Sequence, residues 1–170
     1  MNAIHLLRGM HAASKMQFKI ILGTDDPAQA GDLWKALQPV LELHEALEDE
    51  LLYGPLQAEL GDGTPLGDWE MQHAADVEIV QELVGTAQNL EPGTPAWRMC
   101  IATISDALRR HIMDEEGQIF PRIEQLWGSA RLEEVGAQMQ AATDKATGGA
   151  RSAKARTRAR TTAVATGRKR

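Results

Sequence analysis

The sequence predicts an all-α protein: an up-down-up-down four-helix bundle followed by a short C-terminal helix and a disordered basic tail. Three observations support this fold class. Apolar residues recur at steps of three and four over four long stretches, as in helices with one buried face. Short segments rich in Gly and Pro separate the stretches, and short connections make consecutive helices antiparallel. Beyond Gly148 almost nothing apolar remains to bury, which is typical of disorder.

The composition is that of a soluble globular chain, with 43% hydrophobic and 25% charged residues. We expect one domain, residues 1–147, and a tail, residues 148–170. Cys100 is the single cysteine, which excludes an intrachain disulfide. No apolar run reaches the roughly 20 residues of a membrane span, and the N-terminal stretch lacks the apolar centre of a signal peptide. These features predict a cytoplasmic protein with no membrane partner.

Charge is distributed unevenly along the chain, whose formal net charge is −6. Eight of the 18 basic residues and none of the 24 acidic ones lie from Gly148 onward, so residues 1–147 carry −14. A basic tail can bind nucleic acid without sequence preference by releasing counterions from phosphates. No aromatic residue is interleaved, so stacking on bases is not indicated. We expect a weak, non-specific nucleic-acid contact at most, and a flexible solubilising end is the simpler interpretation.

The first two helices are predicted over residues 2–22 and 32–52, with a loop from Gly23 to Gly31. Pro39 predicts either a kink in the second helix or its true start. The inward stripe of the first helix consists of Ile4, Leu7, His11, Ser14, Phe18 and Ile21. That of the second consists of Leu33, Leu37, Val40, His44, Leu47, Glu48 and Leu51.

Residues 54–67 contain several Gly and Pro residues and predict a loop. The third helix is predicted from Asp68 to about Asn89, and its stripe is His73, Val77, Val80, Val84 and Ala87. Thr94 and Pro95 begin the fourth helix, whose stripe is Ile101, Ile104, Leu108, His111, Glu115 and Ile119 and whose end is bracketed by Pro121 and Gly128. A short fifth helix should run from Ser129 to about Lys145.

The second and fourth helices share a motif: His-x-x-x-Glu, then a second acid, an aromatic residue and Pro. Residues four positions apart share a helix face, so both glutamates should point inward with the histidines. The first and third helices each add one His to a buried stripe. The motif residues are His44, Glu48 and Tyr53 in the first copy and His111, Glu115 and Phe120 in the second.

Four imidazoles and two carboxylates in one bundle interior point to a metal ion. An unpaired buried carboxylate costs several kcal/mol, so an accidental polar core is the weaker interpretation. A cation neutralises the acids and takes imidazole nitrogens as ligands. Six such groups are too many for one tetrahedral zinc, whereas mixed imidazole and carboxylate ligation in a bundle suits a dinuclear iron or manganese centre.

The chain resembles the hemerythrin-like, or HHE cation-binding, domains over about residues 4–127. The resemblance implies a four-helix bundle around a non-heme di-iron site, oxo- or hydroxo-bridged, that reacts with dioxygen or peroxide. Manganese or zinc is the less favoured metal. The resemblance rests on the following residues in this order: His11, His44 with Glu48, His73, and His111 with Glu115, followed by Phe120 and Pro121.

Two positions depart from the oxygen-carrying hemerythrins. Their third helix has a second His where this chain has Val77, which cannot be a ligand. A carboxylate-rich branch of the family, which includes iron-sensing domains, has an acid directly after the second-helix His, so the resemblance implies Glu45 as a ligand; a solvated acid is the alternative. The carriers place the fourth-helix acid at Glu116. We favour Glu115, which lies on the stripe, and expect Glu116 to be solvated or to support a ligand.

The predicted function follows from the number of ligands. Two octahedral irons with this set would keep one position open for dioxygen, peroxide or nitric oxide. A carboxylate in place of an imidazole stabilises ferric iron, which favours sensing of iron or oxygen, or handling of peroxide or nitric oxide, over oxygen transport. The alternatives are an enzyme with catalase-like or NO peroxidase activity and a structural zinc or manganese bundle. The predicted metal ligands are His11, His44, Glu45, Glu48, His73, His111 and Glu115; no residue is predicted to be catalytic or to bind an organic cofactor.

Overall fold

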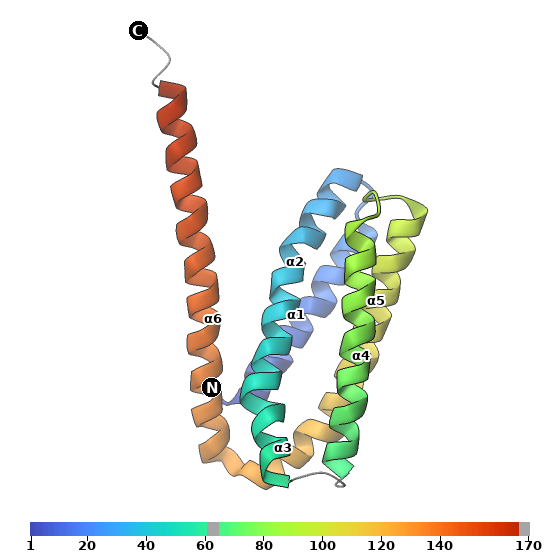
Figure 1. Cartoon of the computed structure of the whole chain (residues 1–170), viewed down its shortest axis with the longest axis vertical. Coiled ribbons are helices and arrows are strands. Elements are labelled where there is room, and N and C mark those ends of the chain that lie inside the picture. The colour runs from blue at the N-terminus through green and yellow to red at the C-terminus, as the bar shows by residue number, and fades with distance from the viewer. Residues whose placement is uncertain (61–64, 167–170) are drawn as a thin grey trace.

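A computed structural model of the chain describes the backbone of residues 1–60 and 65–166 and the side chains of residues 1–60 and 77–148. Helices dominate the described residues, and none of these residues lies in a strand. The elements are α1 (Ala3–Gly23), α2 (Pro27–Glu48), η1 (Asp49–Tyr53), α3 (Gly54–Leu60), α4 (Pro65–Gln88), α5 (Pro95–Asp114), η2 (Glu115–Ile119) and α6 (Phe120–Thr166). Figure 1 shows the resulting antiparallel four-helix bundle, which confirms the predicted fold class.

Capping side chains set where the helices begin. The Asp26 side chain accepts hydrogen bonds from the backbone amides of Ala28 and Gln29, and Pro27 occupies the first turn. This cap starts α2 earlier than predicted, inside the expected loop. The helix then passes through Pro39, so Pro39 is not its start. Thr94 caps α5 as predicted, accepting a hydrogen bond from the amide of Trp97.

Residues 54–60 are helical, and the loop predicted there is wrong. The reason is η1, a π-helical turn in which the amide of Gly54 donates to the carbonyl oxygen of Asp49. A Cβ atom at Gly54 would lie 2.7 Å from that oxygen, so a larger residue here would need the turn to shift slightly. The widened turn directly precedes Pro55, which has no N–H to donate, and the chain continues as α3.

The second π-helical turn, η2, has the same place in the second copy of the motif. The amide of Phe120 donates to the carbonyl oxygen of Glu115, and Pro121 follows directly. The fourth helix of the bundle consists of α5, η2 and the first part of α6. It therefore continues through Pro121 to Gly128, where φ is 67° and the helix breaks. A left-handed φ favours glycine because it has no Cβ atom.

The part of α6 after Gly128 is the predicted C-terminal helix, and it turns back beside α1 (Figure 1). Arg131 donates two hydrogen bonds to the Glu59 carboxylate, and its guanidinium carbon lies 3.9 Å from the centroid of the Trp127 ring. The helical backbone extends to Thr166, past the predicted end near Lys145. Ala and Arg are strong helix formers, which is a local reason for this extension.

The basic tail begins at Gly148, and the side chains from residue 149 on lie outside the described ones. The backbone of residues 148–166 is helical, whereas the sequence predicts disorder there, and the nucleic-acid contact of the tail stays a prediction. Among the described residues, no helix has a stretch long and apolar enough to cross a membrane.

A polar layer separates two apolar clusters inside the bundle. Along α1, Leu7 belongs to one cluster and Phe18 to the other, with the buried His11 and Ser14 between them. The fourth helix of the bundle runs in the opposite direction, and there His111 lies between Leu108 of one cluster and Ile119 of the other. The fold thus places His11 and His111 at one level of the bundle, with an apolar cluster on either side.

Candidate metal centre

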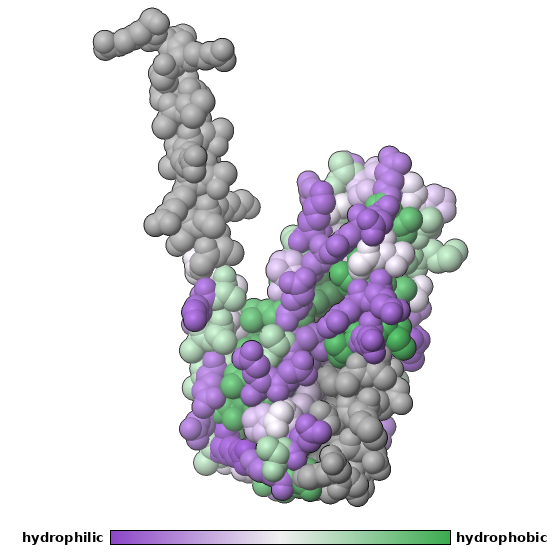
Figure 2. Space-filling model, in the orientation of Figure 1, coloured by the Kyte–Doolittle hydropathy of each residue, from purple (hydrophilic) through white to green (hydrophobic). Residues whose placement is uncertain are grey.

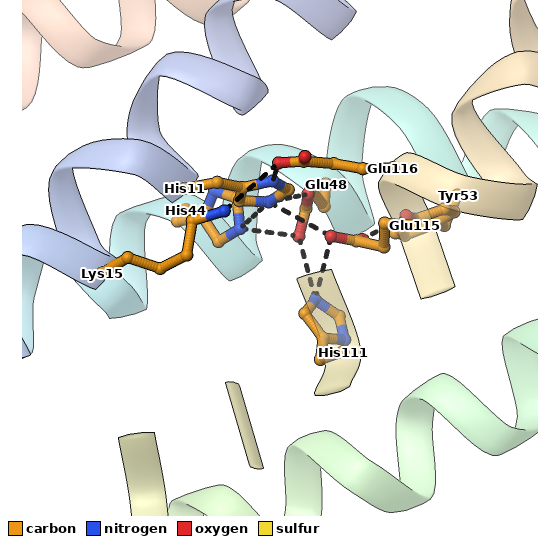
Figure 3. A network of polar contacts seen from close by, with 8 residues as sticks. All are labelled: His11, Lys15, His44, Glu48, Tyr53, His111, Glu115 and Glu116. Carbon is orange, nitrogen blue, oxygen red and sulfur yellow. Dashed lines mark hydrogen bonds and ion pairs between the residues drawn. The ribbon is translucent and has the colours of Figure 1, made fainter. Parts of the chain in front are cut away.

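Five side chains from separate helical segments converge in this polar layer (Figure 3). α1 contributes His11, α2 contributes His44 and Glu48, α5 contributes His111, and η2 contributes Glu115. None of the five is more than 8% exposed. The structure therefore brings together residues that the sequence places on the inward stripes of three different helices.

The donor atoms of these side chains are spaced as metal ligands are. His11 Nε2 lies 3.1 Å from Glu115 Oε2 and 3.2 Å from His44 Nε2. His44 Nε2 lies 3.2 Å from Glu48 Oε2, and His111 Nε2 lies 3.2 Å from Glu115 Oε2. Two ligand atoms that are each about 2.1 Å from one ion, at angles of about 90° to 110°, are about 3.0 to 3.4 Å apart. The donor set therefore fits a metal ion.

The side chains form two overlapping groups of four. His11, His44, Glu48 and Glu115 make the first group, and His44, Glu45, Glu48 and His111 make the second, each with ligand atoms within 4.8 Å of one another.

Glu48 belongs to both groups and reaches towards both sides. Its Oε1 lies 3.8 Å from His11 Nε2, while its Oε2 lies 4.0 Å from His111 Nε2. The two groups share His44 as well as Glu48, so they bring six possible metal ligands into one cluster.

The two buried glutamates have opposite electrostatic environments. Burial, helped by the nearby acids Glu115 and Glu45, raises the pKa of Glu48 well above its usual range. Burial also raises the pKa of Glu115, but hydrogen bonds with His11 and His111 lower it by more. Two buried carboxylates this close do not both ionise without positive charge nearby. Among the described residues, no Lys or Arg forms an ion pair with Glu48, so its buried carboxylate is suited to a cation.

Glu45 approaches the same place from the second group. It is partly buried, and burial raises its pKa to about 7 against the opposing effect of His111. The position agrees with the role that the resemblance implies. Ligation by Glu45 stays a prediction.

Glu115 and Glu116 differ sharply in position. Glu115 is fully buried, whereas the Glu116 side chain is 33% exposed. Oε1 of Glu116 lies 2.9 Å from His11 Nδ1, and Lys15 Nζ lies 3.9 Å from the same oxygen. A proton on Nδ1 donated to Glu116 leaves the Nε2 lone pair pointing at the buried carboxylates. Glu116 thus supports His11 from the solvent side.

Tyr53 is a site residue to which the sequence assigns no role. It is 2% exposed, and its hydroxyl donates a hydrogen bond to Glu115 Oε1. Burial and the adjacent Glu115 raise the pKa of Tyr53 well above its usual value, so the hydroxyl keeps its proton. The signal that could have found it is the difference between the two motif copies, which have Tyr53 and Phe120 at matching positions. Phe120 stacks on His11, with ring centroids 5.7 Å apart.

The third helix, α4, carries His73 and Val77. His73 lies in α4, but its side chain is outside the described residues, and its predicted role as a ligand stays a prediction. Val77, one turn later, lines a cleft beside Glu45 and His111. An apolar residue at this place agrees with the expectation that Val77 is not a ligand.

Comparison with known proteins identifies the family. Residues 2–123 match the family model of the hemerythrin HHE cation-binding domain. The fold is similar to the crystal structure of a hemerythrin HHE cation-binding domain-containing protein from Mycobacterium kansasii, with a TM-score of 0.74 and 22% sequence identity over 88% of this chain and 90% of that one. A search of curated proteins found no match. Because the family model spans well over half of a chain whose helical bundle encloses a histidine and glutamate cluster, the chain belongs to the hemerythrin HHE cation-binding domain family.

Proposed function

We propose that the bundle, residues 1–147, binds two non-heme iron ions and that this centre reacts with or senses dioxygen, peroxide, nitric oxide or iron. The observation that supports it most is the pair of overlapping ligand groups that share Glu48. Mixed imidazole and carboxylate ligands suit iron or manganese, and the set is too large for one tetrahedral zinc. The residues that would hold the metal are His11, His44, Glu45, Glu48, His73, His111 and Glu115.

The surrounding side chains would have different roles in holding such a centre. Glu48 reaches both groups and is the residue best placed to serve two ions. Tyr53 occupies Oε1 of Glu115, so that Oε2 is the oxygen facing His11 and His111. Glu116 orients His11 through its other ring nitrogen.

Bound iron would supply the electrons for reduction of a small oxidant. The surrounding residues control water and protons. Phe120 covers one face of His11, and the complete burial of Glu48 and Glu115 keeps bulk water from the carboxylates. Tyr53 holds a proton at its hydroxyl, next to Glu115.

Access from outside favours a reactive centre over a structural one. A cleft of about 590 Å³ is lined by Glu45 and His111, both members of the second ligand group. A metal that only held the bundle together would need no such opening. The same access suits the enzyme alternative, a catalase-like or NO peroxidase activity.

Metal analysis of protein isolated from its native host tests the proposal. We expect two irons per chain in the wild type and fewer than two in Glu48→Gln, which keeps the shape of the side chain but removes its negative charge. Asp114→Asn is the matched control, because Asp114 is an exposed acid next to the site and belongs to neither ligand group. Zinc in the native protein, or unchanged iron in Glu48→Gln, would contradict the proposal.

Two further measurements separate the modes of action. Stopped-flow spectra of the reduced protein with dioxygen should show irreversible oxidation; an adduct that releases dioxygen under vacuum would favour transport instead. Oxygen evolution from hydrogen peroxide by the iron-loaded protein would favour the catalase-like enzyme over a sensor.

A further inference from the structure

The cleft beside the candidate metal centre is a defined space between α2, α4 and α5. Its volume of about 590 Å³ lies within the range of about 300 to 1,000 Å³ that is usual for sites holding small organic molecules. Along α2 its lining runs from Gln38 to Asp49, which at 1.5 Å per residue is roughly 16 Å. In Figure 2, hydrophobic residues are visible in the hollow between α2 and α4, with hydrophilic residues on its flanks.

Small side chains create this space. Ala46, Ala107 and Gly85 line the cleft, one from each of the three helices. A Cβ atom built at Gly85 would meet nothing within 4 Å, so the glycine faces open space. Larger side chains at these three positions would close the cleft.

The lining combines apolar residues with polar ones. Two of the polar residues, Glu45 and His111, belong to the second ligand group and mark where the cleft meets the candidate centre. Three acids, Glu42, Glu45 and Asp49, line the cleft against the single guanidinium of Arg110. The apolar residues are Leu41, Val77, Val80, Val84, Ile104 and Leu108.

We propose that this cleft binds small, neutral organic molecules with an apolar body and one terminal hydroxyl or hydroperoxyl group, the polar end lying beside Glu45 and His111. Burial of the apolar body against the aliphatic lining would drive binding. A terminal carboxylate would be repelled by Glu42 and Asp49, two acids of the lining that belong to neither ligand group. The inference extends the proposed function in one respect, by placing the polar end of the ligand next to the candidate metal ligands.

A matched pair of probes tests the proposal in the protein as isolated with its metal. 1-Octanol and octanoate have the same chain length and differ in the charge of the head group. Isothermal titration calorimetry should show saturable binding of 1-octanol and at least about tenfold weaker binding of octanoate, a loss of 1.4 kcal/mol or more.

Variants that fill the cleft locate the binding. Gly85→Phe should weaken 1-octanol binding at least about tenfold, because the ring would occupy the open space above Gly85. Gly9→Phe is the matched control: Gly9 is an exposed helical glycine of α1 with equally open surroundings and does not line the cleft. Val80→Trp fills the same cleft from a neighbouring position. It is the test variant to use if Gly85→Phe does not fold.

Three outcomes would overturn the proposal: no saturable binding of 1-octanol, equal binding of octanoate, or undiminished 1-octanol binding in both cleft-filling variants. Iron content, measured on the same samples, keeps this result distinct from the metal proposal. Gly85 belongs to neither ligand group, so Gly85→Phe should retain its iron while losing 1-octanol. A wild type that binds 1-octanol without holding iron would contradict the metal centre alone.

Discussion

Glu116 Oε1 lies 2.9 Å from His11 Nδ1, on the opposite edge of the imidazole from the buried Glu115. The contact joins a partly exposed acid to the most enclosed of the described histidines. When Nδ1 donates its proton to Glu116, the Nε2 lone pair is free for a metal ion, which is the form a metal ligand needs.

Replacing Glu116 should therefore weaken metal binding without removing a proposed ligand. Supporting residues of this kind typically contribute about 10- to 100-fold to metal affinity, and we expect a loss of that size in Glu116→Ala, measured by competition with a chelator. Glu116→Gln keeps an acceptor for the His11 proton and should lose less. Asp114→Ala, an exposed acid two residues away, should bind metal like the wild type; an equal loss there would contradict the role of Glu116.

Tyr53→Phe removes the hydroxyl that donates to Glu115 and leaves the ring in place. Losing the donor to a buried acceptor costs about 1 to 3 kcal/mol, so the free energy of unfolding of the metal-free protein should fall by that amount. Urea denaturation measures it. Phe120 occupies the matching sequence position in the second motif copy. Unchanged stability would show that the hydrogen bond contributes nothing.

The stability of the metal-free protein should fall as pH rises. Burial raises the pKa of Glu45 from 4.5 to about 7 and that of Glu48 well above 4.5. Both groups hold their protons more tightly in the folded state, so their contribution to stability is complete below about pH 4.5 and declines at higher pH. The contribution of Glu45 is lost as pH rises through about 7. Thermal unfolding between pH 5 and 8 should show this decline, and Glu45→Gln should reduce it.

Metal binding should have the opposite pH dependence. The carboxylates must lose their protons to bind a cation, so metal affinity should increase over the same interval. The lowered pKa of Glu115 affects stability only below about pH 4.5 and does not enter this window. A metal-free protein whose unfolding temperature increases between pH 5 and 8 would contradict the carboxylate environment described above.

Gly136 allows the C-terminal helix to dock on the start of the chain. A Cβ atom there would lie 2.4 Å from the carbonyl oxygen of Met1 and 2.7 Å from the amide nitrogen of Ala3. Gly136→Ala should destabilise the protein by about 1 to 3 kcal/mol because the backbones must separate. Gly9→Ala, where a Cβ meets nothing, should instead stabilise α1 by up to about 1 kcal/mol. Calorimetry on both variants checks the difference in sign.

Periodicity alone predicts the bundle because a helix that buries one stripe must repeat it every three or four residues. The stripes through His11, His44 and His111 can therefore be recognised in the sequence, and the fold class is confirmed. The residues at which helices begin and end were less predictable. The loop expected at 54–67 is helical up to Leu60, because a π turn depends on one carbonyl contact at Gly54 that no periodic pattern reveals.

The sequence by itself determined which residue types share the bundle interior: the inward positions of His11, His44 and His111 follow from helical spacing, as does the inward direction of Glu48 and Glu115. Tertiary structure alone decided what each of them meets. Tyr53 and Glu115, which form a hydrogen bond, are 62 positions apart in the sequence, and His11 and Glu116 are 105 positions apart. The cleft beside Glu45 also arises only when three helices pack, because its volume is the space that their small side chains leave unfilled.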